Sequence, residues 1–107
     1  MELSVSRTGL SRVVRIAGVL NRDSGPDVET FLLRLFRCGD DDLVVDCTHV
    51  ESADLDGVGC LLTVGARIRR LGGTVRVSTA GRGPVPLSPA VALALLRPGD
   101  PVAALPA

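Results

Sequence analysis

A pair of carboxylates near the middle of this chain could take part in chemistry. Asp54 and Asp56 flank Leu55, directly before Gly57 and a long apolar run. Two neighbouring carboxylates can act as acid and base, coordinate a hard cation, or cap the first turn of a helix. A cap would explain either aspartate, because a carboxylate accepts backbone N–H bonds and is favoured at the positive end of the helix dipole. It would not explain an apolar Leu55 between two acids.

A calcium loop is one alternative for the same segment. Ser52, Asp54, Asp56 and Gly57 fall on positions 1, 3, 5 and 6 of an EF-hand pattern. The last position of that pattern is then Thr63 and not a bidentate glutamate, and a predicted strand precedes the loop where an EF-hand has a helix. We therefore expect no metal site here.

The cysteines and the single histidine offer a third kind of chemistry. Cys60 and His49 could in principle form the nucleophile and base of a small hydrolase. Cys60 falls near the apolar face of a predicted helix, however, which favours a packing role. Cys38, Cys47 and Cys60 are an odd number without a CxxC motif, and His49 cannot complete a zinc set with them. We expect three free thiols in a reducing compartment.

Length and charge limit the class of protein. The 107 residues, 46% of them hydrophobic, are enough for one modest core, so we expect a single domain over residues 1–107. The formal net charge of zero gives no field that would attract nucleic acid or a membrane surface. No stretch approaches the roughly 18 apolar residues of a membrane-spanning helix, and the N-terminus lacks the apolar region of a signal peptide. We expect a cytoplasmic protein.

The first half of the chain predicts a hairpin, a helix and a strand. Residues 2–20 are β-branched and apolar on both sides of a Thr-Gly turn signal, which predicts two paired strands. Apolar residues at 28, 31, 32, 35 and 36 have the spacing of an amphipathic helix. Ser24 or Pro26 would open this helix and Gly39 would end it. A continuous apolar run at 43–47 is typical of a strand covered on both faces.

The second half predicts two helices and one strand. Residues 57–71 are apolar along one face, with arginines collected near the negative end of the dipole and a Gly-Gly cap after it. Residues 74–79 predict a strand and residues 80–87 a loop. Ser88 with Pro89 would open a short helix through Leu96. The proline-broken tail promises no more than one short strand or turn.

These elements alternate in the order ββαβαβα. The order predicts an α/β fold with a mixed sheet of about four to five strands and helices packed on it. Functional loops of such sheets gather at the carboxyl ends of the parallel strands. The segment with the two carboxylates follows the strand at 43–47, so it lies at such an end.

Several motifs, taken together, resemble the STAS domain family, which includes bacterial anti-sigma factor antagonists. The resemblance covers most of the chain. The order and spacing of the pieces make it specific, although each piece is short. The pieces are "VVRIAGVLN", "LVVDCTHVESADLDGVGCLL", "ARIRRLGG", "TVRV" and "LSPAVALALL".

The resemblance implies a STAS-like fold and a role in the regulation of transcription. In such antagonists, the residue after the motif aspartate is a serine or threonine that a partner kinase phosphorylates, and this kinase is itself the anti-sigma factor. The unphosphorylated antagonist binds the partner and frees the sigma factor, and the phosphate breaks the complex. Here Asp54 matches the motif aspartate, Leu55 the phosphoacceptor and Asp56 the second hydroxyl residue. Gly57 matches a family glycine, and Asn21 replaces a family aspartate.

Leu55 is the departure that matters most, because it has no oxygen that could accept a phosphoryl group. We therefore expect a module that binds an anti-sigma factor/serine kinase without phosphorylation at this position. Leu55 would contribute about 1–2 kcal/mol if it is buried in the complex. In a competing interpretation, Asp56 imitates the phosphorylated, non-binding state. The predicted partner-binding residues are Asn21, Asp54, Leu55, Asp56, Gly57 and Val58.

Two further functions stay open. A STAS accessory subunit of a membrane transporter complex would dock on the transporter ATPase. The hydrolase that would use Cys60 and His49 belongs to a different class of protein. We expect a binding module that is no enzyme and uses no cofactor, with a protein partner, no nucleic acid and no direct membrane insertion.

Overall fold

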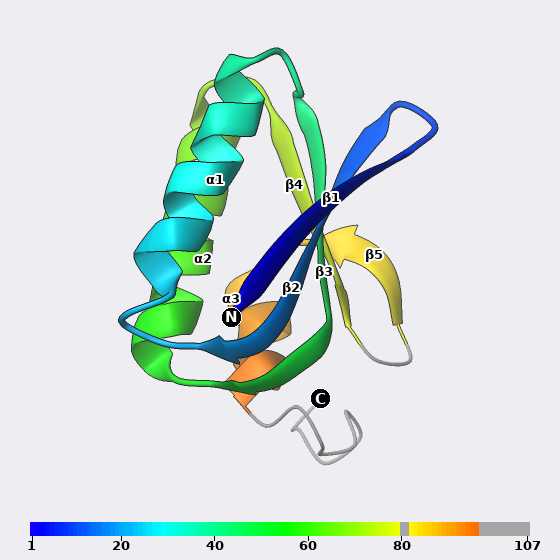
Figure 1. Cartoon of the computed structure of the whole chain (residues 1–107). Helices are drawn as coiled ribbons and strands as arrows, with labels where there is room; N and C mark the ends of the chain where they lie inside the picture. The colour runs from blue at the N-terminus through cyan, green and yellow to red at the C-terminus, as the bar shows by residue number, and fades with distance from the viewer. Residues whose placement is uncertain (80–81, 97–107) are drawn as a thin grey trace.

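The chain begins with a β-hairpin. The computed structural model describes residues 1–79 and 82–96, with strand β1 at Glu2–Thr8 and strand β2 at Ser11–Leu20 (Figure 1). The two strands pair antiparallel along their length, and the turn between them begins at Gly9. Gly9 has a φ of 60°, a left-handed conformation that costs glycine little because it has no Cβ. The predicted hairpin is confirmed.

Three more strands complete a five-stranded sheet in the order β1-β2-β3-β4-β5. They are β3 at Asp42–Ala53, β4 at Thr74–Thr79 and β5 at Arg82–Pro86. The central pairs β2/β3 and β3/β4 are parallel, and the outer pairs are antiparallel. The predicted mixed α/β sheet is confirmed.

Strand β5 corrects the loop that was predicted over residues 80–87. The proline and glycine content of this segment predicts a loop, but the structure pairs Val85 with Val77 and Pro86 with Arg76. β5 is the last strand of the sheet, and proline is tolerated at such an edge because no further strand needs the missing N–H.

Strand β3 and helix α2 both extend beyond their predicted bounds. β3 continues past residue 47 because the second half of β2 pairs with it, up to Leu20 opposite Ala53. Helix α2 spans Leu55–Arg70 and so begins before the predicted start at Gly57. The segment that was expected to be a loop is therefore a strand end and a first helical turn, joined at Asp54 alone.

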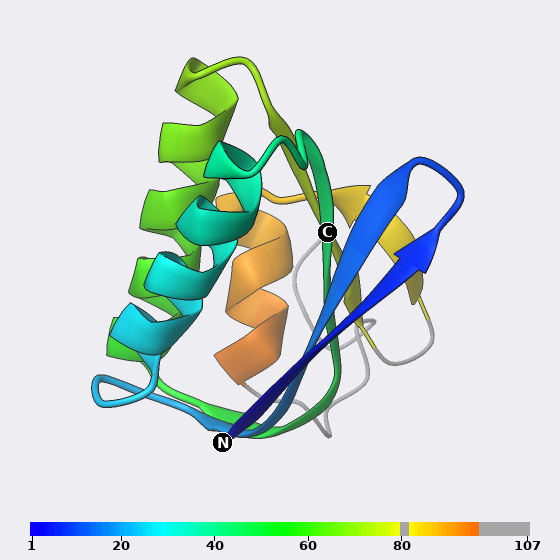
Figure 2. The ribbon, with the colours of Figure 1, turned by 45° about the horizontal axis from the view of Figure 1, so that its top comes forward.

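The helices pack together on one face of the sheet (Figures 1 and 2). Helix α1 spans Gly25–Arg37 and lies beside α2, and the short helix α3 spans Pro89–Leu93. A 3₁₀ turn at Ala94–Leu96 continues α3, so the helix predicted through residue 96 is confirmed with a 3₁₀ end. No helix in the described part of the chain is long and apolar enough to cross a bilayer. The predicted turn or strand in the tail, 97–107, lies outside the described residues.

Local sequence signals set the ends of the helices. Gly39 and Gly72 follow α1 and α2 with φ of 108° and 97°, as the predicted C-caps require. Ser88 precedes α3, and its side chain accepts a backbone N–H bond from the first turn at 3.3 Å. Pro26 lies in the first turn of α1, but Ser24 makes no side-chain cap bond there.

The hydrophobic core fills the space between the sheet and the helices. The apolar face predicted for α1 and that predicted for α2 both point into it. Fully burying one such side chain contributes about 1.5–3 kcal/mol. The largest fully buried side chains are Ile16, Leu20, Leu32, Leu43, Leu61, Ile68, Val14, Val28, Val45, Val64 and Val77.

Candidate functional site

The start of helix α2 is held by Asp54. This residue is extended, with φ of −111° and ψ of 176°, and its Oδ1 accepts the backbone N–H of Gly57 at 2.8 Å. Its backbone carbonyl accepts the N–H of Val58 at 3.0 Å. Asp54 is therefore the helix cap, whereas Asp56 lies exposed in the first helical turn and is favoured there by the helix dipole. The two aspartates have different roles, as a cap alone could not explain both.

Leu55 is the first residue of α2 and lies on the surface. Its exposed fraction is 72%, compared with 0% for Leu20 at the end of the neighbouring strand. A large apolar side chain contributes little to folding stability while it is exposed to water. Burial of this side chain against another molecule would be favourable.

Close backbone contact fixes this helix start against the end of β2. A Cβ on Gly57 would lie 2.3 Å from the carbonyl oxygen of Leu20 and 2.8 Å from the backbone nitrogen of Asn21. The same Leu20 carbonyl accepts the N–H of Asp54 at 3.1 Å. Only glycine fits at position 57, and this contact brings the predicted residues near 21 and near 55 together.

Asn21 organises the loop that leads from β2 into α1. Its side-chain oxygen accepts the N–H groups of Asp23 at 2.9 Å and of Ser24 at 3.0 Å. The hydroxyl of Ser24 donates to the carbonyl of Val19 at 2.7 Å. An aspartate could accept the same two bonds, so asparagine conserves the geometry of this loop and removes a negative charge.

The six predicted partner-binding residues divide into two groups. Asp54, Leu55 and Asp56 are exposed and Asn21 is half-buried. The other two, at positions 57 and 58, are buried, and the Val58 side chain is only 3% exposed. These two lie in the interior, so only four of the six predicted residues are accessible at the surface.

Val19 lies at the same end of the sheet, near the carboxyl end of β2, and was not among the residues predicted from the sequence. It is 41% exposed and pairs with Ser52 near the end of β3. The exposure of Val19 follows from the alternation of side chains along a strand. Because Leu20 points into the core, its neighbour Val19 points outward. Val19 and Leu55 are thus two exposed apolar side chains at the carboxyl ends of β2 and β3.

The cysteines and the histidine show no catalytic arrangement. All three cysteines are free thiols. Burial raises the pKa of Cys47 to about 12. Burial and a hydrogen bond to Glu29 raise the pKa of Cys60, which lowers the thiolate fraction that a nucleophile needs. His49 contacts Thr48 through Nδ1 at 3.0 Å, and no hydrogen bond between His49 and Cys60 occurs among the described residues.

The calcium-loop alternative meets a geometry that does not suit it. Ser52 lies in β3 and Thr63 lies within α2, so the segment between them is no continuous loop. Asp54 already binds the backbone of the helix start. Within residues 1–79 and 82–96, no three His, Cys, Asp or Glu side chains come together as a metal-binding group.

Comparisons with known proteins agree with the fold. Residues 3–97 match the family described as "Mlab, STAS domain". No curated protein sequence matches the chain. A crystal structure of Mglu has a TM-score of 0.65 and 24% identity over 74% of this chain, and the match spans only 20% of the Mglu chain.

Two further solved structures are anti-sigma factor antagonists. SpoIIAA in its unphosphorylated form has a TM-score of 0.58 and 14% identity, covering 71% of this chain and 71% of its own. A STAS domain antagonist from Rhodobacter sphaeroides has a TM-score of 0.59 and 25% identity, covering 71% of this chain and 83% of its own. The first two of these three likenesses show the fold alone. Since the family model covers most of the sequence and the folds agree, the chain belongs to the STAS domain family.

Proposed function

We propose that this protein is a regulatory module that acts by binding and not by catalysis. It resembles an anti-sigma factor antagonist and binds an anti-sigma factor/serine kinase through the surface formed by Val19, Asp54, Leu55 and Asp56. The observation that carries the proposal is Leu55, which is 72% exposed at the first position of α2. The similarity to an antagonist from Rhodobacter sphaeroides at 25% identity supports the class of partner.

The side chain at position 55 makes the module independent of phosphorylation there. Leucine has no hydroxyl, so no kinase can transfer a phosphoryl group to it. An exposed leucine at a helix start can bind a partner with little loss of conformational entropy, because the backbone is already ordered before the partner arrives. Burial of Leu55 in a partner pocket would contribute about 1–2 kcal/mol, enough to change the affinity by about tenfold.

The competing role for Asp56 can be separated from this one. A single carboxylate carries less charge than a phosphate group, and Asp56 lies one residue after the acceptor position. If Asp56 imitated the phosphorylated state, Asp56→Asn would create partner binding that the wild type lacks. We expect the wild type to bind already, and Asp56→Asn to leave the affinity within about threefold, as for a rim charge.

A capture experiment tests the binding surface. Wild type, Leu55→Asp and Leu10→Asp serve as baits in extract from the native host, with quantitative mass spectrometry. Leu10 is a matched control, because it is also an exposed leucine, 94% accessible in the hairpin turn. We expect an anti-sigma factor kinase with the wild type and with Leu10→Asp, and its loss with Leu55→Asp. Recovery of a transporter ATPase in its place would favour the accessory-subunit alternative, and equal recovery with both variants would contradict the surface.

A phosphorylation assay tests the lost switch. The captured kinase is incubated with labelled ATP and with wild type or Leu55→Ser. We expect no label on the wild-type segment 50–58 and label on Leu55→Ser at residue 55. Label on wild-type Ser52 would contradict the proposal, since the module would then keep a switch at a neighbouring hydroxyl.

A further inference from the structure

A cavity of about 370 Å³ lies at the other end of helix α2. Gly65 and Arg69 of α2 line one side of it, and the start of β4 and the end of β5 line the other. Leu55 and Arg69 are the first residue and a last-turn residue of the same helix, so the cavity is roughly 20 Å from the Leu55 surface at 1.5 Å per residue. This cavity is therefore a separate site, and its role goes beyond the proposed function.

The cavity exists because β5 ends early. The last paired residue of β5 is Pro86, opposite Arg76. The first two residues of β4, Thr74 and Val75, therefore have no paired residue in β5. Pro86 has no N–H, and the last backbone link is the N–H of Leu87 to the carbonyl of Val75 at 3.3 Å. Beyond this link no strand among the described residues pairs with the start of β4 on the side away from β3, where Thr74 and Val75 pair with Asp42 and Leu43.

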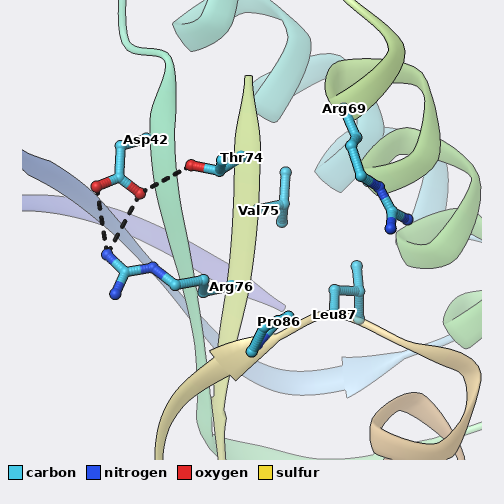
Figure 3. A pocket seen from close by; sticks show the side chains of 8 residues that line it. Asp42, Arg69, Thr74, Val75, Arg76, Pro86 and Leu87 are labelled. Carbon is cyan, nitrogen blue, oxygen red and sulfur yellow. Dashed lines mark hydrogen bonds and ion pairs between the residues drawn. The ribbon is translucent and has the colours of Figure 1, made fainter. Parts of the chain in front are cut away.

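The wall nearest α2 is apolar. Val75 and Leu87 are 9% and 5% exposed and face the space below α2. A Cβ on Gly65 would lie 2.6 Å from Cδ2 of Leu87, so the missing side chain of Gly65 is what lets Leu87 take its place. Figure 3 shows Arg69 extending from α2 on the same side of β4 as Val75 and Leu87.

The lining residues on the other side of β4 are polar, but their charges are balanced. Both carboxylate oxygens of Asp42 lie 3.3 Å from Nη2 of Arg76. Asp42 also accepts a hydrogen bond from the hydroxyl of Thr74 at 3.1 Å (Figure 3). The hydroxyl of Ser11 donates to it at 2.8 Å. Arg69 has no such partner among the ion pairs of the described residues. The lining within residues 1–79 and 82–96 therefore presents an apolar wall and one positive charge without an ion-pair partner.

We propose that this cavity binds a small amphipathic monocarboxylate. The apolar body of the ligand packs against Val75 and Leu87, and its carboxylate pairs with the guanidinium of Arg69. The volume is within the range of about 300–1,000 Å³ that is usual for small-molecule sites, and mostly apolar walls with few polar groups are typical of them. An anion suits the site because Arg69, the one charged residue of the described lining without an ion-pair partner, is positive.

Octanoate is the probe that tests this site, with octanol as the uncharged control. The full chain is labelled with ¹⁵N and titrated while backbone NMR shifts are followed. We expect saturable shifts at the cavity residues with a Kd of about 1 mM for octanoate, the affinity that about ten heavy atoms can supply. We expect octanol to bind about tenfold more weakly, because it cannot pair with Arg69.

Two pairs of variants locate the binding. Arg69→Gln is expected to weaken octanoate about tenfold, whereas Arg70→Gln, which removes the same charge next to it but outside the lining, leaves Kd unchanged. Gly65→Ala pushes Leu87 into the cavity and is expected to weaken binding by a similar factor. Gly59→Ala is its control, because a Cβ there meets nothing within 4 Å. Leu55→Asp should leave octanoate binding unchanged.

The contrary results are equally definite. The proposal is wrong if shifts show no saturation up to about 10 mM octanoate, an order of magnitude above the expected Kd. It is also wrong if octanol binds as tightly as octanoate, or if the two arginine variants lose the same affinity. Because the arginine pair does not depend on Gly65→Ala folding, these outcomes decide the matter even if that variant is unstable. None of them bears on the Leu55 surface, so the proposed function is tested separately.

Discussion

The two ends of helix α2 offer different things to another molecule. At its start, Leu55 presents an exposed apolar side chain, with Asp54 and Asp56 on either side. At its end, Arg69 lies at a cavity whose apolar wall includes Val75 and Leu87. The start can enter a recess on a partner, whereas the end can receive a small ligand.

The difference has its cause in what holds each end. The start is held by hydrogen bonds to the backbone: the carbonyl of Leu20 accepts the N–H of Asp54, and the carboxylate of Asp54 accepts the N–H of Gly57. Side chains shape the other end, where Leu87 occupies the room left by Gly65. Different contacts therefore hold the two ends of α2, and we expect a substitution at one end to leave the site at the other end unchanged.

Among the substitutions at the two ends of α2, Gly57→Ala is expected to have the largest effect, a destabilisation of about 3 kcal/mol. The added Cβ would lie 2.3 Å from the carbonyl oxygen of Leu20, and this atom is backbone, so the end of β2 or the start of α2 must move. Urea unfolding followed by circular dichroism measures the change. Gly59→Ala in the same helix is the control: its Cβ meets open space, and it should stabilise by about 0.5–1 kcal/mol. Equal behaviour of both variants would show that the helix start is not pressed against β2.

Asp42→Asn addresses the polar wall at the other end and should destabilise by about 1–2 kcal/mol, after allowance for partial exposure. Asp42 accepts bonds from Ser11, Thr74 and Arg76, and an amide satisfies these donors less well. Asp41→Asn is the matched control, because its side chain is next in sequence and exposed. Unfolding free energies of the two variants at neutral pH provide the comparison, and a loss in Asp41→Asn as large as in Asp42→Asn would remove the special role of this carboxylate.

The stability difference between wild type and Asp42→Asn is expected to depend on pH. The hydrogen bond from Ser11, and then those from Thr74 and Arg76 with the charge of Arg76, lower the pKa of Asp42. The unfolded chain therefore binds a proton at this group more readily than the folded chain. The stability from Asp42 is present above the unfolded pKa of about 3.9 and is lost as pH falls through the lower folded value. We expect the stability gap between wild type and Asp42→Asn to shrink below about pH 4.

Asp54→Ala removes the cap at the start of α2 and should lower the free energy of unfolding by about 1 kcal/mol, the usual value of a lost N-cap. The variant leaves the N–H of Gly57 without its 2.8 Å partner. Asp54→Asn should keep most of the stability, because asparagine caps a helix about as well as aspartate. Thermal unfolding of both variants checks the prediction, and a drop of equal size in both would point to lost charge instead of a lost cap.

Local patterns in the sequence were enough to predict most of the fold. The apolar spacing of α1 predicted a helix face, and Val28 and Leu32 are fully buried on it. The carboxylates near Gly57 predicted a helix start, and Asp54 caps it. In these places the physical cause lies within one or two turns of chain, so a pattern can report it.

Features that depend on distant contacts were missed. β5 has the composition of a loop and becomes a strand only because the edge of β4 is available to it. The cavity depends on Gly65 and Leu87, which are far apart in the chain, and on Asp42, whose partner Ser11 is 31 residues away. No periodicity encodes such pairs. The exposure of Val19 was predictable in principle, because Leu20 beside it is so plainly a core residue.

Leu55→Ala should have the smallest effect on folding, within about 0.5 kcal/mol of the wild type. The side chain is 72% exposed, so its removal uncovers little core surface. Leu20→Ala is the contrast, since that side chain is 0% exposed and its loss should cost about 2–5 kcal/mol. Both variants are measured by urea unfolding at the same concentration. A loss of more than about 1 kcal/mol in the free energy of unfolding of Leu55→Ala would mean that residue 55 supports the fold. This result would contradict the proposal that the exposed Leu55 side chain serves to bind a partner.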